Sequence, residues 1–199
     1  MKIDGQCFAF GIRHMKMGYL TLLIGCMFAQ KTTELLRRIR RYKSIGYSVL
    51  VVNYAEDTRY GSNQIASHDA DSYEARTCMK LEEVRAEVES GKFQVLVVDE
   101  GQFFKDLYPL VTEWSDKLPL HIIVAGLDGD SERRPFGDLL KLVPYAEEVE
   151  RLTAFCAQCK DGTIGVFSKY MAGKKEGQVE IGGADRYLPV CRKHFLEGR

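Results

Sequence analysis

The sequence predicts an α/β fold in which helices flank a mostly parallel β-sheet, followed by a small C-terminal metal-binding module. Short runs of β-branched and other apolar residues, without polar alternation, are typical of strands that are covered on both faces. Charged amphipathic stretches separate these runs, and this alternation is typical of layered α/β domains. A late cluster of cysteines in a polar, glycine-rich context marks the C-terminal module.

The first helix is predicted over residues 33–43 (TELLRRIRRYK), because Leu35, Leu36, Ile39 and Tyr42 share one face and arginines occupy the other. Two further charged amphipathic stretches predict helices: 79–90 (MKLEEVRAEVES) and 105–117 (KDLYPLVTEWSDK). The predicted strands are apolar runs that end at a polar residue or a glycine: 20–24 (LTLLI), 49–52 (VLVV), 95–98 (VLVV) and 122–124 (IIV).

The chain of 199 residues is expected to form one main domain with a small appendage. We expect residues 1–17 to be a poorly ordered N-terminal extension, residues 18–149 to be the α/β domain and residues 150–199 to be the metal-binding module. The change of character near residue 150, where glycines become frequent and apolar runs become short, sets the boundary.

Composition limits the function classes. Lys and Arg together number 28, as do Asp and Glu, so the net charge is zero and neither nucleic acid nor an anionic membrane is an expected partner. No apolar run approaches the ~18 residues of a transmembrane helix, and the N-terminal sequence lacks the features of a signal peptide. We therefore expect a soluble cytoplasmic protein with reduced cysteines.

The loop after the first predicted strand fits the phosphate-binding pattern G-x-x-x-x-G-K-[ST], with Gln30 in place of the second glycine. Such a loop directs backbone N–H groups at phosphate oxygens. Its position between the first strand and the first helix predicts a fold like that of the P-loop NTPases. Lys31 would neutralise the β- and γ-phosphates, and the Thr32 hydroxyl would hold Mg²⁺. A plain strand–turn–helix is the alternative. The predicted nucleotide-binding residues here are Gly25, Cys26, Met27, Phe28, Ala29, Gln30, Lys31 and Thr32.

Two acidic residues, Asp99 and Glu100, directly follow the strand predicted at 95–98. Adjacent residues at a strand end point in different directions, so one can address a metal while the other accepts a proton from an acceptor hydroxyl. Two surface acids without a function are the alternative for this pair alone. Together with the lysine and threonine of the loop, the pair favours a phosphoryl-transfer site.

A closed zinc site is predicted near the C-terminus. Cys156 and Cys159 form one C-x-x-C knuckle, and Cys191 and His194 form a second one after 31 intervening residues. Three thiolates and one imidazole complete a tetrahedral site without an open position, which is typical of structural zinc. A disulfide and a coincidental grouping are the alternatives.

These motifs, in this order, resemble those of the cytosolic-type, zinc-containing (type II) thymidine kinases. The resemblance covers Gly18 to Phe195. The sequence VVDEGQFF, which contains the two acids, is closer to the eukaryotic and viral members of the family than to the bacterial ones. The further motifs that carry it are DTRY (57–60), VVDEGQFF (97–104), AGLDGDSERRPFGDLLKLVPYAEEVERL (125–152) and IGGADRY (181–187).

The resemblance implies transfer of the γ-phosphoryl group of ATP to the 5′-hydroxyl of thymidine or deoxyuridine, with Mg²⁺, in a homotetramer that serves nucleotide salvage. It implies that Glu100 is the general base, that Asp57 and Arg59 act near the reacting phosphates, and that Asp99 and Gln102 belong to the ATP and metal site. It also implies that a loop from Ser168 to Tyr187 closes over the nucleoside. The implied substrate-binding residues are Met27, Phe103, Leu127, Ser131, Phe136, Ser168, Glu180, Ile181, Gly182 and Tyr187.

Four positions depart from the family pattern. Cys26, Ala29 and Gln30 stand where the family has Pro, Ser and Gly, and Ser131 stands where it usually has an aromatic residue that stacks on the base. The Gln30 side chain is expected to crowd the nucleotide, unless it turns outward and donates its amide to a phosphate. A catalytically impaired member that binds nucleoside or assembles as a subunit is therefore the alternative function. A zinc-ribbon protein for nucleic acid, or another phosphate-loop enzyme, is a further one.

Overall fold

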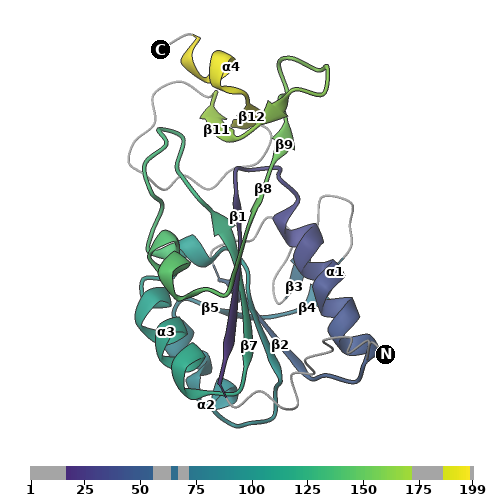
Figure 1. Cartoon of the computed structure of the whole chain (residues 1–199), viewed down its shortest axis with the longest axis vertical. Coiled ribbons are helices and arrows are strands. Elements are labelled where there is room, and N and C mark those ends of the chain that lie inside the picture. The colour runs from purple at the N-terminus through teal and green to yellow at the C-terminus, as the bar shows by residue number, and fades with distance from the viewer. Residues whose placement is uncertain (1–16, 56–63, 67–71, 172–185, 198–199) are drawn as a thin grey trace, which may run out of the picture.

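The computed structural model describes residues 17–55, 64–66, 72–171 and 186–197. A six-stranded parallel sheet with strand order β5-β2-β6-β7-β1-β8 forms its centre (Figure 1). The expected parallel sheet is therefore confirmed. The strands are β1 (Tyr19–Gly25), β2 (Val49–Tyr54), β5 (Arg76–Cys78), β6 (Val95–Val98), β7 (His121–Leu127) and β8 (Glu148–Leu152).

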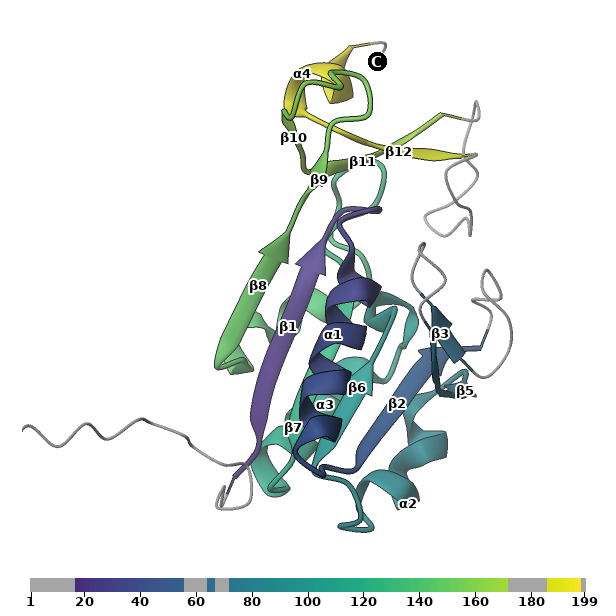
Figure 2. The same ribbon diagram turned by 90° about the vertical axis from the view of Figure 1, so that its right-hand side faces the viewer.

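Helices cover both faces of this sheet, which explains why its strands are apolar without alternation (Figure 2). In β1, Leu20 and Leu22 pack toward the side of α3 (Leu107–Lys117), whereas Leu23 packs toward α1 (Lys31–Ser44). Trp114 lies fully buried on the α3 side. Two apolar clusters, one on each face, thus hold the three layers together.

The stretch expected to form one helix over 79–90 is instead divided. A short 3-10 helix η2 (Leu81–Val84) leads into a single α-helical turn, α2 (Arg85–Val88). Leu81 and Val84 are both buried, and their spacing of three residues suits the tighter 3-10 geometry. Tertiary packing therefore overrides the helical periodicity of the charged residues in between.

The C-terminal part of the described chain stands at the carboxyl end of the sheet (Figures 1 and 2). Two antiparallel pairs and one helix build it, and β8 leads into the first of them, across the boundary that we predict at residue 150. The remaining elements are β3 (Gln64–Ala66), β4 (Ser72–Glu74), η3 (Gly101–Phe103), η4 (Leu139–Tyr145), β9 (Ala154–Phe155), β10 (Ile164–Gly165), β11 (Phe167–Tyr170), β12 (Tyr187–Val190) and α4 (Arg192–Leu196).

Within the described residues, no helix has both the length and the apolar character needed to cross a membrane. The expected N-terminal extension lies outside the described residues, apart from Met17. The division of the chain into an extension, an α/β domain and a metal-binding module stays a prediction.

A buried histidine, His121, begins β7 and ties three elements together. Its Nδ1 lies 2.7 Å from the Tyr42 hydroxyl, and its Nε2 lies 2.9 Å from Oγ1 of Thr21. The Thr21 hydroxyl donates to Glu148, so it accepts from Nε2–H, which leaves Nδ1 as the acceptor for Tyr42. Burial first, and then the nearby Arg38 guanidinium, lower the pKa of His121 to about 4, although the Glu148 carboxylate opposes them.

The lowered pKa of His121 predicts that the free energy of unfolding falls in mild acid. Between the unfolded pKa of about 6.5 and the folded pKa of about 4, the unfolded chain binds a proton that the folded chain does not, so stability falls as the pH falls. The contribution from His121 changes by about 1.5 kcal/mol between pH 6.5 and pH 5. Denaturant unfolding at both pH values measures it, and His121→Gln should lose this part of the pH dependence. Equal pH dependence in both proteins would contradict the assignment.

Candidate active site and metal-binding cluster

The phosphate loop joins the end of β1 to the start of α1. Phe28 and Gln30 adopt left-handed backbone conformations, with φ of 64° and 59°, and the helix begins directly afterwards at Lys31. The loop therefore lies at the N-terminus of a 14-residue helix, where unpaired N–H groups and the helix dipole favour an anion.

Gln30 is exposed, directly before the start of α1. It lines a surface depression together with Ala29 of the same loop, with Thr33, Glu34 and Arg37 of α1 and with Leu152 and Thr153. This placement supports the outward alternative over crowding of the nucleotide. Gln30 nevertheless occupies a left-handed conformation, which glycine adopts without steric cost and which costs an L-residue about 1 kcal/mol or more.

The first turn of α1 meets the carboxyl end of β6. Thr32 donates its hydroxyl hydrogen to the Asp99 carboxylate at 2.9 Å, and Lys31 donates from Nζ to the carbonyl of Cys26 at 2.8 Å. Burial and the Glu100 carboxylate raise the pKa of Asp99, whereas burial lowers the pKa of Lys31 against the attraction of both acids. A buried carboxylate next to a hydroxyl offers the hard oxygen ligands that Mg²⁺ prefers, so this donor set fits that ion.

Glu100 is held in place by Gln102, a contact that the sequence did not predict. Glu100 has a left-handed backbone with φ of 52°, and its N–H donates to the Asp99 side chain at 2.9 Å. The Gln102 amide donates to the Glu100 carboxylate at 2.6 Å, and its carbonyl accepts the backbone N–H of Leu127 at 3.0 Å. Gln102 is 3% exposed, so Glu100 is positioned by a buried side chain anchored on β7.

Gly126 makes room for this positioning side chain. A Cβ at residue 126 would lie 2.4 Å from the Gln102 side-chain oxygen and 2.8 Å from the Leu139 side chain. Gly126 lies within the motif at 125–152, but nothing in the sequence indicates that it makes room for Gln102. Its role becomes visible only when β7 and the segment after β6 are packed together.

Aromatic side chains gather beside Glu100. The ring of Phe103 stacks on Tyr54, with centroids 5.2 Å apart, and meets the Phe136 ring edge-on at 5.4 Å. The structure thus brings together two of the residues expected to line the base pocket, and it adds Tyr54, which the sequence analysis missed. Leu127, at the end of β7, is half-buried.

The other expected substrate residues have mixed positions. Met27 donates its backbone N–H to Oγ of Ser168 at 2.9 Å, and Tyr187 is buried with its ring 5.2 Å from that of Tyr170. Ser131 is half-buried in the loop after β7. Five expected site residues lie outside the described residues: Asp57, Arg59, Glu180, Ile181 and Gly182.

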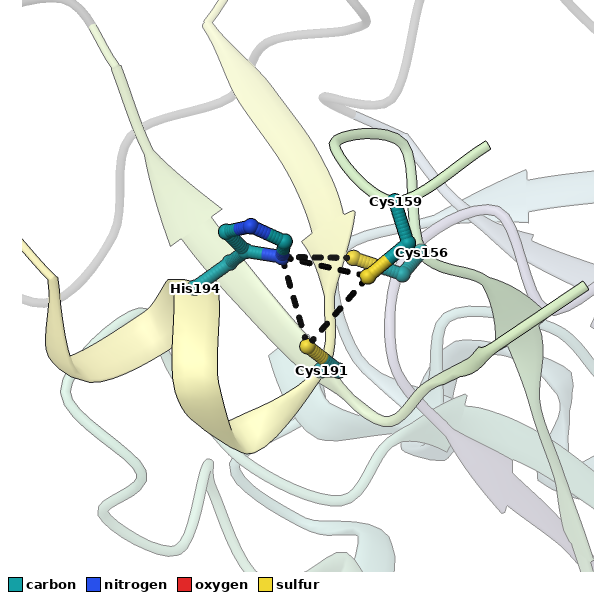
Figure 3. Close-up of side chains that lie close together, drawn as sticks. All are labelled: Cys156, Cys159, Cys191 and His194. Carbon is teal, nitrogen blue, oxygen red and sulfur yellow. Dashed lines mark hydrogen bonds between the residues drawn. The ribbon is translucent and has the colours of Figure 1, made fainter. Parts of the chain in front are cut away.

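The four predicted zinc ligands converge, as Figure 3 shows. Nδ1 of His194 lies 3.3–3.4 Å from the three sulfurs, and the sulfurs of Cys159 and Cys191 lie 3.8 Å apart. Bond lengths of about 2.3 Å for Zn–S and about 2.0 Å for Zn–N give tetrahedral edges of roughly 3.8 and 3.5 Å, so the cluster fits zinc. The three cysteines are not joined as disulfides.

The comparisons with known proteins agree with the motifs. Residues 18–195 match the family described as Thymidine kinase. The chain is 39% identical over 184 residues to the thymidine kinase of vaccinia virus (strain Western Reserve), covering 92% of this chain and 99% of the viral protein. It is also 39% identical over 185 residues to the cytosolic thymidine kinase of Gallus gallus, covering 92% of this chain and 79% of the relative.

A family match over nearly the whole chain, together with relatives of this identity and coverage, confirms the resemblance. The matched span, residues 18–195, contains the phosphate loop, the two acids and the metal-binding cluster. The chain belongs to the thymidine kinase family.

Proposed function

We propose that this chain is an active thymidine kinase that transfers the γ-phosphoryl group of ATP to the 5′-hydroxyl of thymidine or deoxyuridine, giving the 5′-monophosphate for nucleotide salvage. One observation carries the proposal. The contact between Thr32 and Asp99 sets the metal-binding groups beside Glu100, and Glu100 is itself held by a buried amide. By resemblance, we also propose a homotetramer in the cytoplasm.

Phosphoryl transfer depends mainly on position and charge. The backbone N–H groups at the start of α1 would bind the phosphates, and Lys31 would leave the carbonyl of Cys26 to pair with a phosphate oxygen. Thr32 and Asp99 would hold Mg²⁺, which when bound neutralises phosphate charge. Glu100 would accept the proton of the 5′-hydroxyl group. The 5′-oxygen would bond to the γ-phosphorus while the bond between that phosphorus and the oxygen of the leaving ADP breaks.

For the nucleoside, we propose that Met27, Phe103, Leu127 and Phe136 line the thymine pocket. The stacking of Phe103 with Tyr54 supports this, because it gives the pocket a rigid aromatic wall. Ser131, Ser168 and Tyr187 stay proposed nucleoside contacts. The roles of Asp57 and Arg59 near the phosphates, and of Glu180, Ile181 and Gly182 over the base, stay predictions.

The left-handed conformation of Gln30 and the altered loop favour one alternative, a catalytically impaired member of the family. A thymidine phosphorylation assay with MgATP, combined with binding of each substrate, separates the two. Turnover supports the enzyme, and thymidine binding without turnover supports the impaired member. Nucleic-acid binding with a steep salt dependence would instead favour a zinc-ribbon protein that binds nucleic acid.

Glu100→Gln should lower kcat by about 10²-fold or more, because it removes the general base while keeping the shape of the side chain. Thymidine affinity should stay within a few-fold of the wild type. Steady-state kinetics and thymidine titration measure both. Glu113→Gln, on α3, is the matched control and should leave kcat unchanged. If Glu100→Gln retained more than about a tenth of the wild-type kcat, the proton acceptor would have to be another group.

One zinc ion per chain should be found in protein purified without added metal, held by Cys156, Cys159, Cys191 and His194. Replacing Cys159 by Ala should abolish zinc retention and unfold the C-terminal module, because binding energy at a closed site is folding energy. Cys78→Ala removes a buried cysteine outside the cluster and should retain the metal. Less than half an equivalent of zinc, with the fold intact after strong chelation, would overturn the assignment.

Gln30→Gly should raise the free energy of unfolding by about 0.5–1 kcal/mol, because relief of the left-handed strain exceeds the added flexibility of the unfolded chain. MgATP affinity should change by less than about twofold, since Gln30 is exposed to solvent. Denaturant unfolding and MgATP titration measure these effects. A tenfold tightening of MgATP binding would instead mean that the glutamine crowds the phosphates.

A further inference from the structure

The short strand β11 lies between the metal-binding cluster and the phosphate loop. Successive side chains of a strand point to opposite faces, so β11 can contact both. Phe167 packs on Phe195 of α4 with ring centroids 5.1 Å apart. Lys169 donates from Nζ to the backbone carbonyls of His194 and Glu197, each at 2.6 Å, and so holds the C-terminal end of the helix that carries a metal ligand.

Ser168, the residue between Phe167 and Lys169, faces the phosphate loop. Its side chain is buried, and its hydroxyl accepts the backbone N–H of Met27 in the phosphate loop at 2.9 Å. The preceding loop residue, Cys26, donates from its thiol to the carbonyl of Gly165 at 3.4 Å. Two consecutive residues of the phosphate loop are therefore fastened to the segment 165–168.

The same segment is continuous with the metal-binding cluster. Gly165 belongs to β10, which pairs with β9 directly before Cys156. A Cβ on Gly165 would lie 3.2 Å from the backbone of Cys156, so the two strands approach closely. Displacement of the metal-binding knuckle would therefore move the carbonyl and hydroxyl that hold the loop.

The loop after β7 also contacts the C-terminal module. Arg133, with a left-handed φ of 66°, sets its guanidinium 4.7 Å from the ring centroid of Phe195 and 5.6 Å from that of Phe167. The buried Asp130 carboxylate fixes this loop by accepting the N–H groups of Glu132 and Arg134 at 2.8 and 2.9 Å. Cation–π contacts of this kind hold the module on the α/β domain at a second point.

We propose that Ser168 is a positioning residue for the phosphate loop, and that β11 couples metal binding by the Cys3His cluster to nucleotide binding. The inference rests on the proposed function, because it assumes that the loop binds ATP. Without the Ser168 hydroxyl, the Met27 N–H loses its partner and the loop loses an anchor that sets its shape before ligand arrives. Coupling between two sites is reciprocal, so nucleotide must in turn favour metal retention.

The first experiment titrates MgATP into the full-length, zinc-loaded protein. Ser168→Ala should weaken MgATP binding about fivefold, the effect of one neutral hydrogen bond, with zinc content unchanged. Ser168→Thr keeps the hydroxyl and should bind MgATP like the wild type. Ser115→Ala, which removes a buried serine hydroxyl on α3, is the matched control and should not alter the affinity.

The second experiment measures zinc affinity at equilibrium, by competition with a chelator selective for zinc over magnesium, with and without saturating MgATP. MgATP should raise the zinc affinity about fivefold in the wild type and in Ser168→Thr, but not in Ser168→Ala. Unchanged zinc affinity in the wild type, or wild-type MgATP affinity in Ser168→Ala, would overturn the coupling while leaving the kinase proposal intact. Failure of the wild type to bind MgATP would overturn both.

Discussion

The hydrogen bond between Thr32 and Asp99 is the contact on which the site depends, because it joins the first turn of α1 to the end of β6. All strands of the main sheet are parallel, so their carboxyl ends meet at one edge, where loops that carry chemistry gather. The phosphate loop follows β1 and the acids follow β6. Leu127, at the end of β7, anchors the amide that holds Glu100. The ends of three strands thus converge on the proposed reaction centre.

The groups at this edge are less stable than those of the layers beneath them. Gln30 and Glu100 both have left-handed backbones, and burial raises the pKa of Asp99 and lowers that of Lys31, so it disfavours the charged form of each group. Conformations and charges of this kind each cost about 1–3 kcal/mol and persist only where the surrounding structure enforces them. The apolar clusters on the two faces of the sheet supply that support, and bound phosphate and Mg²⁺ would compensate the charges directly.

The metal-binding cluster contributes to the same edge from outside the sheet. It organises a few short strands and one helical turn that have only a small apolar cluster of their own, around Val190 and Phe195. A module of this size needs a further source of stability, which a closed metal site supplies. Because the module contacts the phosphate loop and the loop that holds Arg133, its order bears on the geometry of the reaction centre.

Although it gave no sign of the edge strands β5 and β8, the sequence by itself determined four strands of the main sheet (β1, β2, β6 and β7), α1, the loop with Lys31 and Thr32, the two acids and the spacing of the Cys3His cluster. Each of these is encoded locally, by apolar runs, by helical periodicity or by fixed spacing of reactive side chains. Only the tertiary structure decided that Gln102 positions Glu100, that Tyr54 stacks on Phe103, that Gln30 is exposed and that 79–90 divides into two short helices. These features arise from packing between segments far apart in the chain, and such contacts leave no periodic or spaced signal in either segment alone.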